Sequence, residues 1–165
     1  GNNNTILSSW LTDFTCGDNN EIGPYTKCRA NTVLENGCRV GNFVELKNAH
    51  FNDGVKSAHL TYIGDAEIGE KTNIGCGTIT ANYDGFNKMR TTVGKECFVG
   101  SGTILVAPVS MEDRSFTAAG STITKDVKED TLSIARGRQV DIEHGYTIFR
   151  TKAKAKKEAL NKEKK

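Results

Sequence analysis

The sequence is poor in aromatic residues and in proline. Of 165 residues, 7% are aromatic and two are proline, whereas 17 are glycine. This composition predicts a core of small aliphatic side chains and a backbone that bends sharply at repeated glycines. Long apolar runs are lacking too: none approaches the roughly 18 residues that a membrane-spanning helix needs, and no signal-peptide pattern is present. We therefore expect one globular domain that does not insert into a membrane.

Metal-binding spacings are also lacking. The five cysteines are odd in number and follow no zinc-site spacing. The three histidines, His50, His59 and His144, do not match an inter-subunit three-histidine site. We expect no metal site, and free thiols in a reducing cytoplasm at Cys16, Cys28, Cys38, Cys76 and Cys97.

Charge is distributed unevenly along the chain. Residues 150–165 contain eight basic and two acidic side chains, a net charge of +6, so residues 1–149 carry −4 of the overall +2. A body of that charge is not expected to bind nucleic acid. The basic tail either attracts phosphates and acidic surfaces or is a solvated helical end. Since the chain begins at Gly1 and not at Met, we expect an excised piece of a longer protein, a processed form or a tagged one.

What the sequence does contain is a repeat of six residues. Apolar side chains or threonine recur at this spacing in three runs: Trp10, Cys16, Ile22, Cys28, Leu34, Val40 and Leu46; Tyr62, Ile68, Ile74 and Thr80; Val93, Val99, Leu105, Met111, Thr117 and Ile123. An α-helix would repeat about every three or four residues, and an antiparallel sandwich would place turns about every 8–12 residues. Neither fits this spacing.

A six-residue period fits a short strand followed by a bend, with three such units closing one coil of a triangular prism. The predicted fold class is therefore all-β, a left-handed parallel β-helix of hexapeptide repeats. We expect the β-helix over residues 1–127, with a protruding loop at 81–92, and a C-terminal arm with a basic helical tail over 128–165. Because uniform prism walls offer few pockets, function is expected where the repeat is broken or where prisms meet.

Segments throughout the chain resemble one known family. They are HLTYIGD (59–65), NIGCGTITANYDG (73–85) followed by FNK, IGPYTKCR (22–29), VGNFVELK (40–47), FVGSGTILVAP (98–108), AAG (118–120) and SIAR (133–136). Over roughly residues 6–146 the chain resembles the C-terminal acetyltransferase domain of the bifunctional GlmU enzymes, which belong to the hexapeptide-repeat transferases. The first coils, LSSWLTDFTCGD, and the Ala-Asn pair after Arg29 depart from the family pattern.

The resemblance implies an activity and its setting. The activity is glucosamine-1-phosphate N-acetyltransferase, which moves the acetyl group of acetyl-CoA to the amine of glucosamine 1-phosphate for bacterial UDP-N-acetylglucosamine and cell-wall biosynthesis. It implies a cytoplasmic homotrimer with active sites between subunits. The uridyltransferase half of the family, to which Mg²⁺ would belong, is absent from this chain.

The resemblance also implies residue roles on the sugar side. His59 matches the general base, and a neutral imidazole can accept a proton from the attacking amine near neutral pH. The cations Arg29, Lys47 and Lys88 match contacts to the phosphate and the sugar, for which fixed charges and forked donors are suited. Tyr62 and Asn73 match residues that bind sugar hydroxyls.

On the acetyl-CoA side, the matching positions lie in the loop and in the later repeats. Asn82 holds either the substrate amine or the developing oxyanion. Cys76 stands where the family usually has alanine and faces the acyl carbonyl with its backbone N–H, so direct transfer is expected rather than an acyl-cysteine intermediate. The remaining acetyl-CoA contacts are Tyr83, Ser101, Ala119, Arg136 and Tyr146.

Two other functions stay open on the residues alone. A hexapeptide acyltransferase for another amino sugar would need the same fold and His59. A non-catalytic hexapeptide scaffold would need the fold but not His59, Asn82 and Arg136 together.

Overall fold

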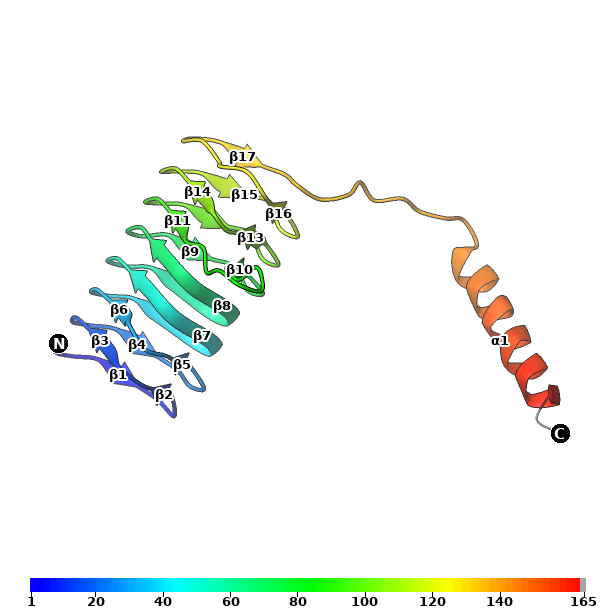
Figure 1. Cartoon of the computed structure of the whole chain (residues 1–165), viewed down its shortest axis with the longest axis horizontal. Helices are drawn as coiled ribbons and strands as arrows, with labels where there is room; N and C mark the ends of the chain where they lie inside the picture. Colours follow the sequence, from blue (N-terminus) through cyan, green and yellow to red (C-terminus); the bar gives the residue numbers. More distant parts are fainter. Residues whose placement is uncertain (164–165) are drawn as a thin grey trace.

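The structure is a computed structural model that describes residues 1–163 as a stack of β-strand coils from which one helix stands apart (Figure 1). Lys164 and Lys165, the end of the expected basic tail, lie outside the described residues. The strands are β1 (Thr5–Ile6), β2 (Trp10–Leu11), β3 (Phe14–Cys16), β4 (Glu21–Ile22), β5 (Lys27–Cys28), β6 (Thr32–Leu34), β7 (Arg39–Phe51), β8 (Lys56–Ile68), β9 (Asn73–Ile74), β10 (Ile79–Ala81), β11 (Thr91–Val93), β12 (Phe98–Val99), β13 (Ile104–Val106), β14 (Val109–Met111), β15 (Phe116–Thr117), β16 (Thr122–Ile123) and β17 (Leu132–Ser133).

Each strand pairs in parallel with the strand one coil further on. In one ladder Cys28 lies opposite Leu46, and Leu46 lies opposite Ile63. In the upper coils Thr80 lies opposite Leu105, and Leu105 opposite Ile123. This continuous parallel ladder confirms the predicted parallel β-helix.

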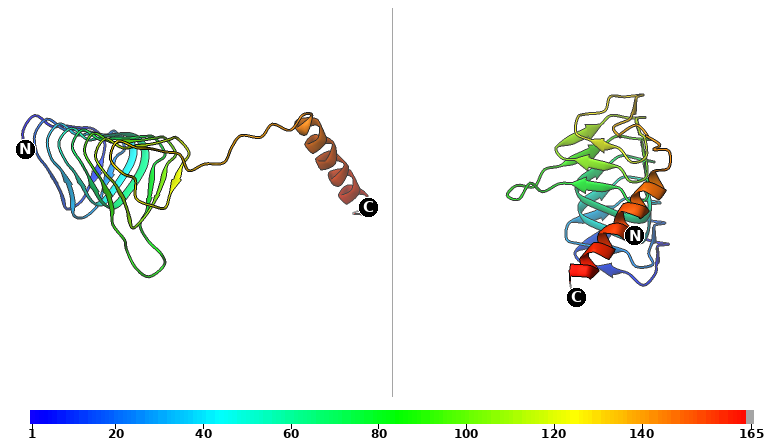
Figure 2. Two further views of the ribbon diagram at one scale, coloured as in Figure 1. Left: turned by 90° about the horizontal axis from the view of Figure 1, so that it is seen from above. Right: turned by 90° about the vertical axis from the view of Figure 1, so that its right-hand side faces the viewer.

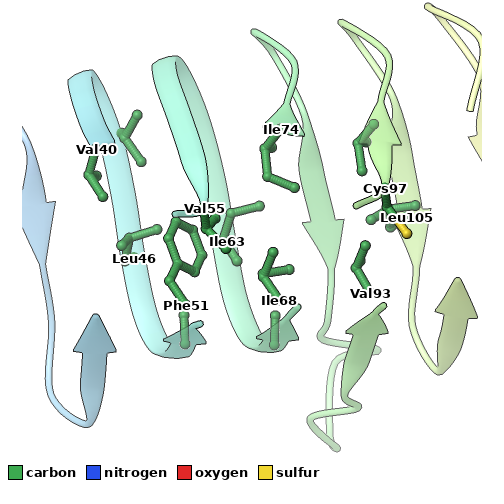
Figure 3. Packing of buried hydrophobic residues seen from close by; sticks show 14 of the residues in the cluster. Val40, Leu46, Phe51, Val55, Ile63, Ile68, Ile74, Val93, Cys97 and Leu105 are labelled. Carbon is green, nitrogen blue, oxygen red and sulfur yellow. The ribbon is translucent and has the colours of Figure 1, made fainter. Parts of the chain in front are cut away.

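The core is a column of aliphatic side chains stacked coil upon coil inside the prism (Figure 3). Most residues at the six-residue spacing are buried, from Ile22 through Leu46 and from Ile68 to Ile123. Two predicted core positions are wrong. Trp10 is 72% exposed, and its neighbour Leu11 packs against the core instead.

Tyr62 is the second wrong core position. Its neighbour Ile63 is the fully buried residue, because Leu46 pairs with Ile63 at a step of 17 residues rather than 18. One shortened side of the prism therefore moves the register by one residue, and in a strand a one-residue shift exchanges the inner and outer faces. Tyr62 consequently lies on the outer wall.

The three edges of the prism are columns of residues with positive φ. Short polar residues and glycine tolerate this conformation best. We call them edge A (Ser8, Tyr25, Phe43, Leu60, Gly77, Gly102, Gly120), edge B (Asp13, Asn31, Asn48, Asp65) and edge C (Asn19, Gly37, Gly54, Lys71, Glu96, Arg114, Asp130). Backbone hydrogen bonds join successive members of a column, for example Gly77 N–H to Leu60 C=O at 2.7 Å and Asn31 N–H to Asp13 C=O at 3.2 Å.

At edge B one coil is interrupted by a loop. Residues 82–90 leave the wall between β10 and β11 and form the green hairpin that projects from the stack in Figure 2. The loop is narrower than the expected 81–92, since Ala81 and Thr91 belong to strands. Tyr83 and Lys88 form an antiparallel bridge within it.

The β-helix extends beyond residue 127, the end expected from the sequence. Val127 forms a parallel bridge with Met111, and β17 pairs with β15. An irregular segment then leads to α1 (Gly145–Glu163), which stands away from the prism in Figures 1 and 2. Within residues 1–163, no helix combines the length and apolar character needed to cross a membrane.

Candidate active site

A buried carboxylate organises the polar side chains at edge B. Asp65 Oδ1 accepts hydrogen bonds from Lys47 Nζ at 2.9 Å and from Asn48 Nδ2 at 2.7 Å. Asp65 Oδ2 accepts one from Asn82 Nδ2, at the start of the loop. Asp65 and Asn82 are only 6% and 7% exposed. Three coils thus contribute to one cluster, because Asn48, Asp65 and Asn82 follow each other up the prism.

The charges of this cluster support each other. Burial by itself raises the pKa of the Asp65 carboxyl, but the hydrogen bonds from Asn48, Lys47 and Asn82 together outweigh it and hold that pKa below its usual value. The hydrogen bond to Asp65 is the main cause that raises the pKa of Lys47, although burial opposes it. Both groups are therefore ionised at neutral pH.

The backbone beside Asp65 is held just as closely. The Gly64 N–H donates to Thr80 Oγ1 at 2.7 Å, and the Thr80 hydroxyl donates back to the Gly64 carbonyl at 3.0 Å. A Cβ atom on Gly64 would overlap the Tyr62 hydroxyl and lie 2.8 Å from Asn82 Nδ2. The Tyr62 hydroxyl and the Asn82 amide therefore converge over Gly64, next to Lys47.

Two further cations lie near this cluster. Arg29 stands one coil below Lys47 on the same ladder, since Cys28 lies opposite Leu46, and its Nη1 is 3.2 Å from Glu45 Oε1. Lys88 returns from the loop so that its side chain reaches that of Lys47. Like charges brought side by side favour binding of an anion. Four of the five residues expected to bind the sugar phosphate, Arg29, Lys47, Tyr62 and Lys88, thus lie near edge B together with Asn82, and their binding role stays a prediction.

A second set of predicted residues forms a column beside edge A. The register that places Asn42 opposite His59 and Ser57 opposite Ile74 also places Cys76 one coil above His59. Ser101 and Ala119 follow in the next coils, because Ile74 pairs with Val99 and Val99 with Thr117.

The turns in this column leave donors unpaired. The Gly75 and Gly100 carbonyls each accept an N–H from the residue three positions on, at 3.2 Å, and Gly77 and Gly102 supply the positive φ that such turns require. In the part of the chain that the structure describes, the backbone N–H groups of Cys76, Ser101 and Ala119 donate to no acceptor. They form a row of free donors up the prism. At its top Arg136 Nη1 donates to the Ala119 carbonyl at 2.7 Å.

His59 lies at the lower end of this column with its side chain exposed. The Thr61 hydroxyl donates to its carbonyl at 2.6 Å, which fixes the backbone. Its side chain lines a surface cavity of about 280 Å³ together with Asn42 and Arg39. A separate hollow of about 420 Å³ between edges A and B is lined by Phe43, Leu60, Tyr62 and Ile79.

Some predicted site residues do not meet within one chain. His59 and Asp65 are six residues apart along β8, which places them up to about 20 Å from each other at about 3.3 Å per residue. Asn73 lies on the wall that leads to edge A, between Lys56 and Phe98. Tyr83 is 62% exposed on the loop, and Tyr146 is 77% exposed on α1.

Sequence reasoning missed Asp65, Asn48, Gly64 and Thr80. One signal was present, since Asp13, Asn31, Asn48 and Asp65 recur every 17 or 18 residues as short polar residues. Such side chains are the ones that tolerate positive φ at an edge. Residues 1–163 hold no group of three or more His, Cys, Asp or Glu side chains arranged to bind a metal ion.

The cysteines differ in reactivity according to their surroundings. All five are free thiols, and Cys76 is the exposed one beside His59. Burial raises the pKa of Cys28 to about 12 and that of Cys38 to about 11. Buried neutral thiols are poor nucleophiles, so Cys28 and Cys38 serve as core residues.

Comparison with known proteins finds close relatives of one kind. The chain is 52% identical over 144 residues to the bifunctional protein GlmU of Staphylococcus epidermidis, covering 87% of this chain and 32% of the relative. It is 56% identical over 136 residues to GlmU of Pseudomonas entomophila, covering 82% of this chain and 30% of the relative. The chain thus spans about a third of the length of the curated relatives it matches. No family model matches the chain.

The solved structures that match the chain are more distant in sequence. The polySia specific acetyltransferase NeuO is 16% identical, with a TM-score of 0.49 over 86% of this chain and 85% of that one. A mutant of AntD, an N-acyltransferase from Bacillus cereus, is 11% identical, with a TM-score of 0.44 over 92% of each chain.

Proposed function

Since this chain belongs with the acetyltransferase domains of the GlmU family, we propose that it transfers the acetyl group of acetyl-CoA to the amine of glucosamine 1-phosphate. The amine attacks the thioester carbonyl, a C–N bond forms, the C–S bond breaks and CoA leaves as the thiol. The attacking nitrogen loses one proton in the process. His59 accepts it, a contribution of roughly 10²–10⁴ in rate for a positioned general base, and the departing thiolate then takes up this proton to become the thiol.

Edge B is the proposed site for the sugar phosphate. The observation that carries this assignment is the half-buried, ionised Lys47, whose ammonium is held by Asp65 on the same edge as the Tyr62 hydroxyl and interacts with Lys88. A phosphate dianion takes up the remaining ammonium donors and neutralises the positive charge of Lys47 and Lys88. Arg29, one coil below, adds a forked donor, and charge-assisted bonds of this kind are worth about 1.5–3 kcal/mol each. Asn73 contributes a contact to a sugar hydroxyl.

The column beside edge A is the proposed acetyl-CoA site. The free N–H groups of Cys76, Ser101 and Ala119 are suited to the carbonyl oxygens of an extended pantetheine chain and its thioester. The Cys76 N–H is the donor nearest His59, so it stabilises the oxyanion, and the thiol takes no part. Arg136 at the upper end pairs with a CoA phosphate, while Tyr83 and Tyr146 cover the ligand from the loop and the arm.

We further propose that a homotrimer completes the site. One chain holds His59 beside edge A and the Asp65 cluster at edge B, so we expect a second chain to supply one of these two halves to each site. Edge A also exposes a contiguous apolar strip, with Tyr25, Phe43 and Leu60 each about 60% exposed. Such a strip is typical of a surface that pairs with another chain.

Two parts of the proposal concern the whole protein. Its longer form is expected to carry a uridyltransferase domain that uses the product to make UDP-N-acetylglucosamine. Its cytoplasmic location is expected because acetyl-CoA and five free thiols belong to a reducing compartment.

Thiol release from acetyl-CoA tests the function. We expect turnover with glucosamine 1-phosphate and a kcat/KM at least about 10²-fold lower with glucosamine, since the phosphate contacts are lost. Equal rates with glucosamine or glucosamine 6-phosphate would contradict the substrate and favour another amino-sugar acyltransferase. Absence of thiol release with every amino sugar would contradict the activity and favour a scaffold.

A further inference from the structure

Asp65 is a buried charged residue that takes no part in any step of the proposed reaction. Its carboxylate accepts three side-chain hydrogen bonds, from Lys47, Asn48 and Asn82. Its backbone adopts a φ of 49°, and the Thr80 hydroxyl is hydrogen-bonded to both the N–H and the carbonyl of the preceding residue, Gly64. A carboxylate held so firmly at the substrate edge orients whatever is bonded to it.

The polarity of these bonds fixes the direction of the Asn82 amide. An ionised carboxylate accepts hydrogen bonds and cannot donate them. Asn82 must therefore turn its NH2 group toward Asp65, and its Oδ1 points away from the carboxylate. Within residues 1–163 no donor is hydrogen-bonded to this oxygen. Asn82 thus presents an acceptor to the site.

The same carboxylate aims Lys47. One of the three ammonium donors is engaged by Asp65 Oδ1, at 2.9 Å, with the two side chains 20% and 9% exposed. A long lysine side chain otherwise samples many rotamers, and ordering it costs conformational entropy. Because Asp65 already orders it, the other two donors are directed before the substrate arrives.

We propose that Asp65 is a positioning residue that holds Lys47 toward the sugar phosphate and turns the Asn82 carbonyl oxygen toward the substrate amine. This inference rests on the proposed acetyl transfer. The attacking nitrogen then donates one N–H to Asn82 Oδ1 and the other to His59, so that its lone pair points at the thioester carbonyl. The oxyanion is left to the Cys76 N–H. Of the two roles that the sequence left open for Asn82, the geometry selects the first.

Reversal of the hydrogen-bond polarity tests this inference. Asp65→Asn alone is expected to lower kcat/KM for glucosamine 1-phosphate by about 10²-fold, mainly in kcat, because a misplaced reacting group costs about this much. Asn82→Asp alone is expected to lower it at least as far, since two carboxylates then face each other. In the double variant the amide at 65 donates to the carboxylate at 82, whose other oxygen again faces the amine. We expect the double variant to exceed Asn82→Asp by at least about tenfold.

The outcomes are separable from those of the proposed function. A wild-type chain that releases no thiol contradicts the function itself. An active wild type whose Asp65→Asn variant stays within twofold contradicts the inference, as does a double variant no better than Asn82→Asp, because a donor role for Asn82 cannot be rescued by a carboxylate. Asp113→Asn is the matched control: Asp113 accepts the Lys95 N–H at 2.8 Å near edge C, away from the site, and its loss should leave activity unchanged.

A second pair of variants decides the question if Asp65→Asn fails to fold. Asn82→Thr keeps a hydroxyl that donates to Asp65 and accepts from the amine, whereas Asn82→Val has the same shape without either function. We expect the threonine variant to be at least about tenfold more active than the valine variant, the scale of one hydrogen bond to a charged group. Equal activity of the two would overturn the inference.

Discussion

Among single residues, Gly64 is a glycine whose free space is taken up by side chains of the site. It has no positive φ that would demand glycine, yet the Tyr62 hydroxyl and the Asn82 amide occupy the space where a Cβ would lie. The demand for glycine therefore comes from the site and not from the backbone. This separates a functional glycine from those of edge A, where Gly77 and Gly102 are needed for their turn geometry.

The Gly64→Ala variant should consequently lose activity more than stability. The added methyl group displaces the Tyr62 hydroxyl or the Asn82 amide, and a shift of about 1 Å at a reacting group costs about 10²-fold in rate. We expect kcat/KM for glucosamine 1-phosphate to fall by that order while KM for acetyl-CoA stays near the wild-type value. Steady-state kinetics with each substrate varied in turn measures this. Normal activity of the variant would show that the Tyr62 hydroxyl and the Asn82 amide can move aside without loss of function.

Asp65 should also make stability depend on pH in the acid range. Its folded-state pKa is held below the ordinary value. The carboxylate therefore stabilises the fold above the unfolded-state pKa, near 4, and this contribution is lost as pH falls through the lower folded-state pKa. We expect the Tm of the wild type to exceed that of Asp65→Asn at pH 7 and the difference to shrink below about pH 4. Thermal melts of both chains across this range measure the effect, and a difference that is constant with pH would contradict it.

At the scale of elements, the sequence was sufficient to predict the strands of the β-helix but not the residues that meet at its edges. The six-residue repeat predicted the parallel β-helix because each strand contributes one buried aliphatic side chain per side. It did not predict that one side of the prism before Ile63 is shorter by one residue. The spacing of apolar residues alone does not show this shift, which becomes visible only when each coil is paired with the next. It also did not predict the Asp65 cluster, whose members lie 17 residues apart and meet only when coils stack.

The loop of residues 82–90 owes its shape to Asp84. The Asp84 carboxylate accepts the backbone N–H groups of Phe86 at 2.8 Å and Asn87 at 2.6 Å, and these bonds, that of Asn87 first, lower its pKa. The turn they close returns the chain so that Lys88 reaches Lys47. Asp84 therefore stabilises the conformation of the loop and does not contribute to the core.

Asp84→Ala should weaken the sugar-phosphate site without weakening the fold. An open turn no longer directs Lys88, and loss of one charge-assisted contact corresponds to a KM increase of about tenfold or more. We expect that rise in KM for glucosamine 1-phosphate together with an unchanged Tm, because the loop lies outside the prism. Kinetics and thermal melts on the same preparation provide both values, and a large fall in Tm would mean that the loop supports the prism.

At the scale of the whole molecule, the separation of the two edges bears on assembly. If a site takes His59 from one chain and the cations of edge B from another, chains defective in different halves can complement each other. Arg29 is the suitable partner to test, because its side chain is 51% exposed and its loss leaves no buried charge behind. Lys47 is unsuitable, since its removal would strand the buried Asp65.

His59→Ala and Arg29→Ala chains co-expressed with different tags should therefore regain activity that neither has alone. In randomly mixed trimers at equal ratio, about a quarter of the shared sites carry both intact residues. Double purification removes the trimers of one chain type, so about a third of the sites in that fraction carry both intact residues, and we expect activity of that order, measured by thiol release. Mixed oligomers as inactive as the two parents would show that each site is confined to one chain.

The stacking of coils, each bonded only to the coil above and below, also governs how the molecule comes apart. A structure built this way has no contacts that join its two ends, so opening proceeds inward from either end. The first coil is expected to be less stable than the others, because its apolar residues Ile6, Leu7 and Trp10 are about half exposed or more. The long strands β7 and β8 lie in the middle, and β8 carries both His59 and Asp65. Amide hydrogens should accordingly exchange with solvent in a gradient, fastest at β1 and β17 and slowest at β7 and β8, so that partial unzipping leaves the reacting groups in place until last.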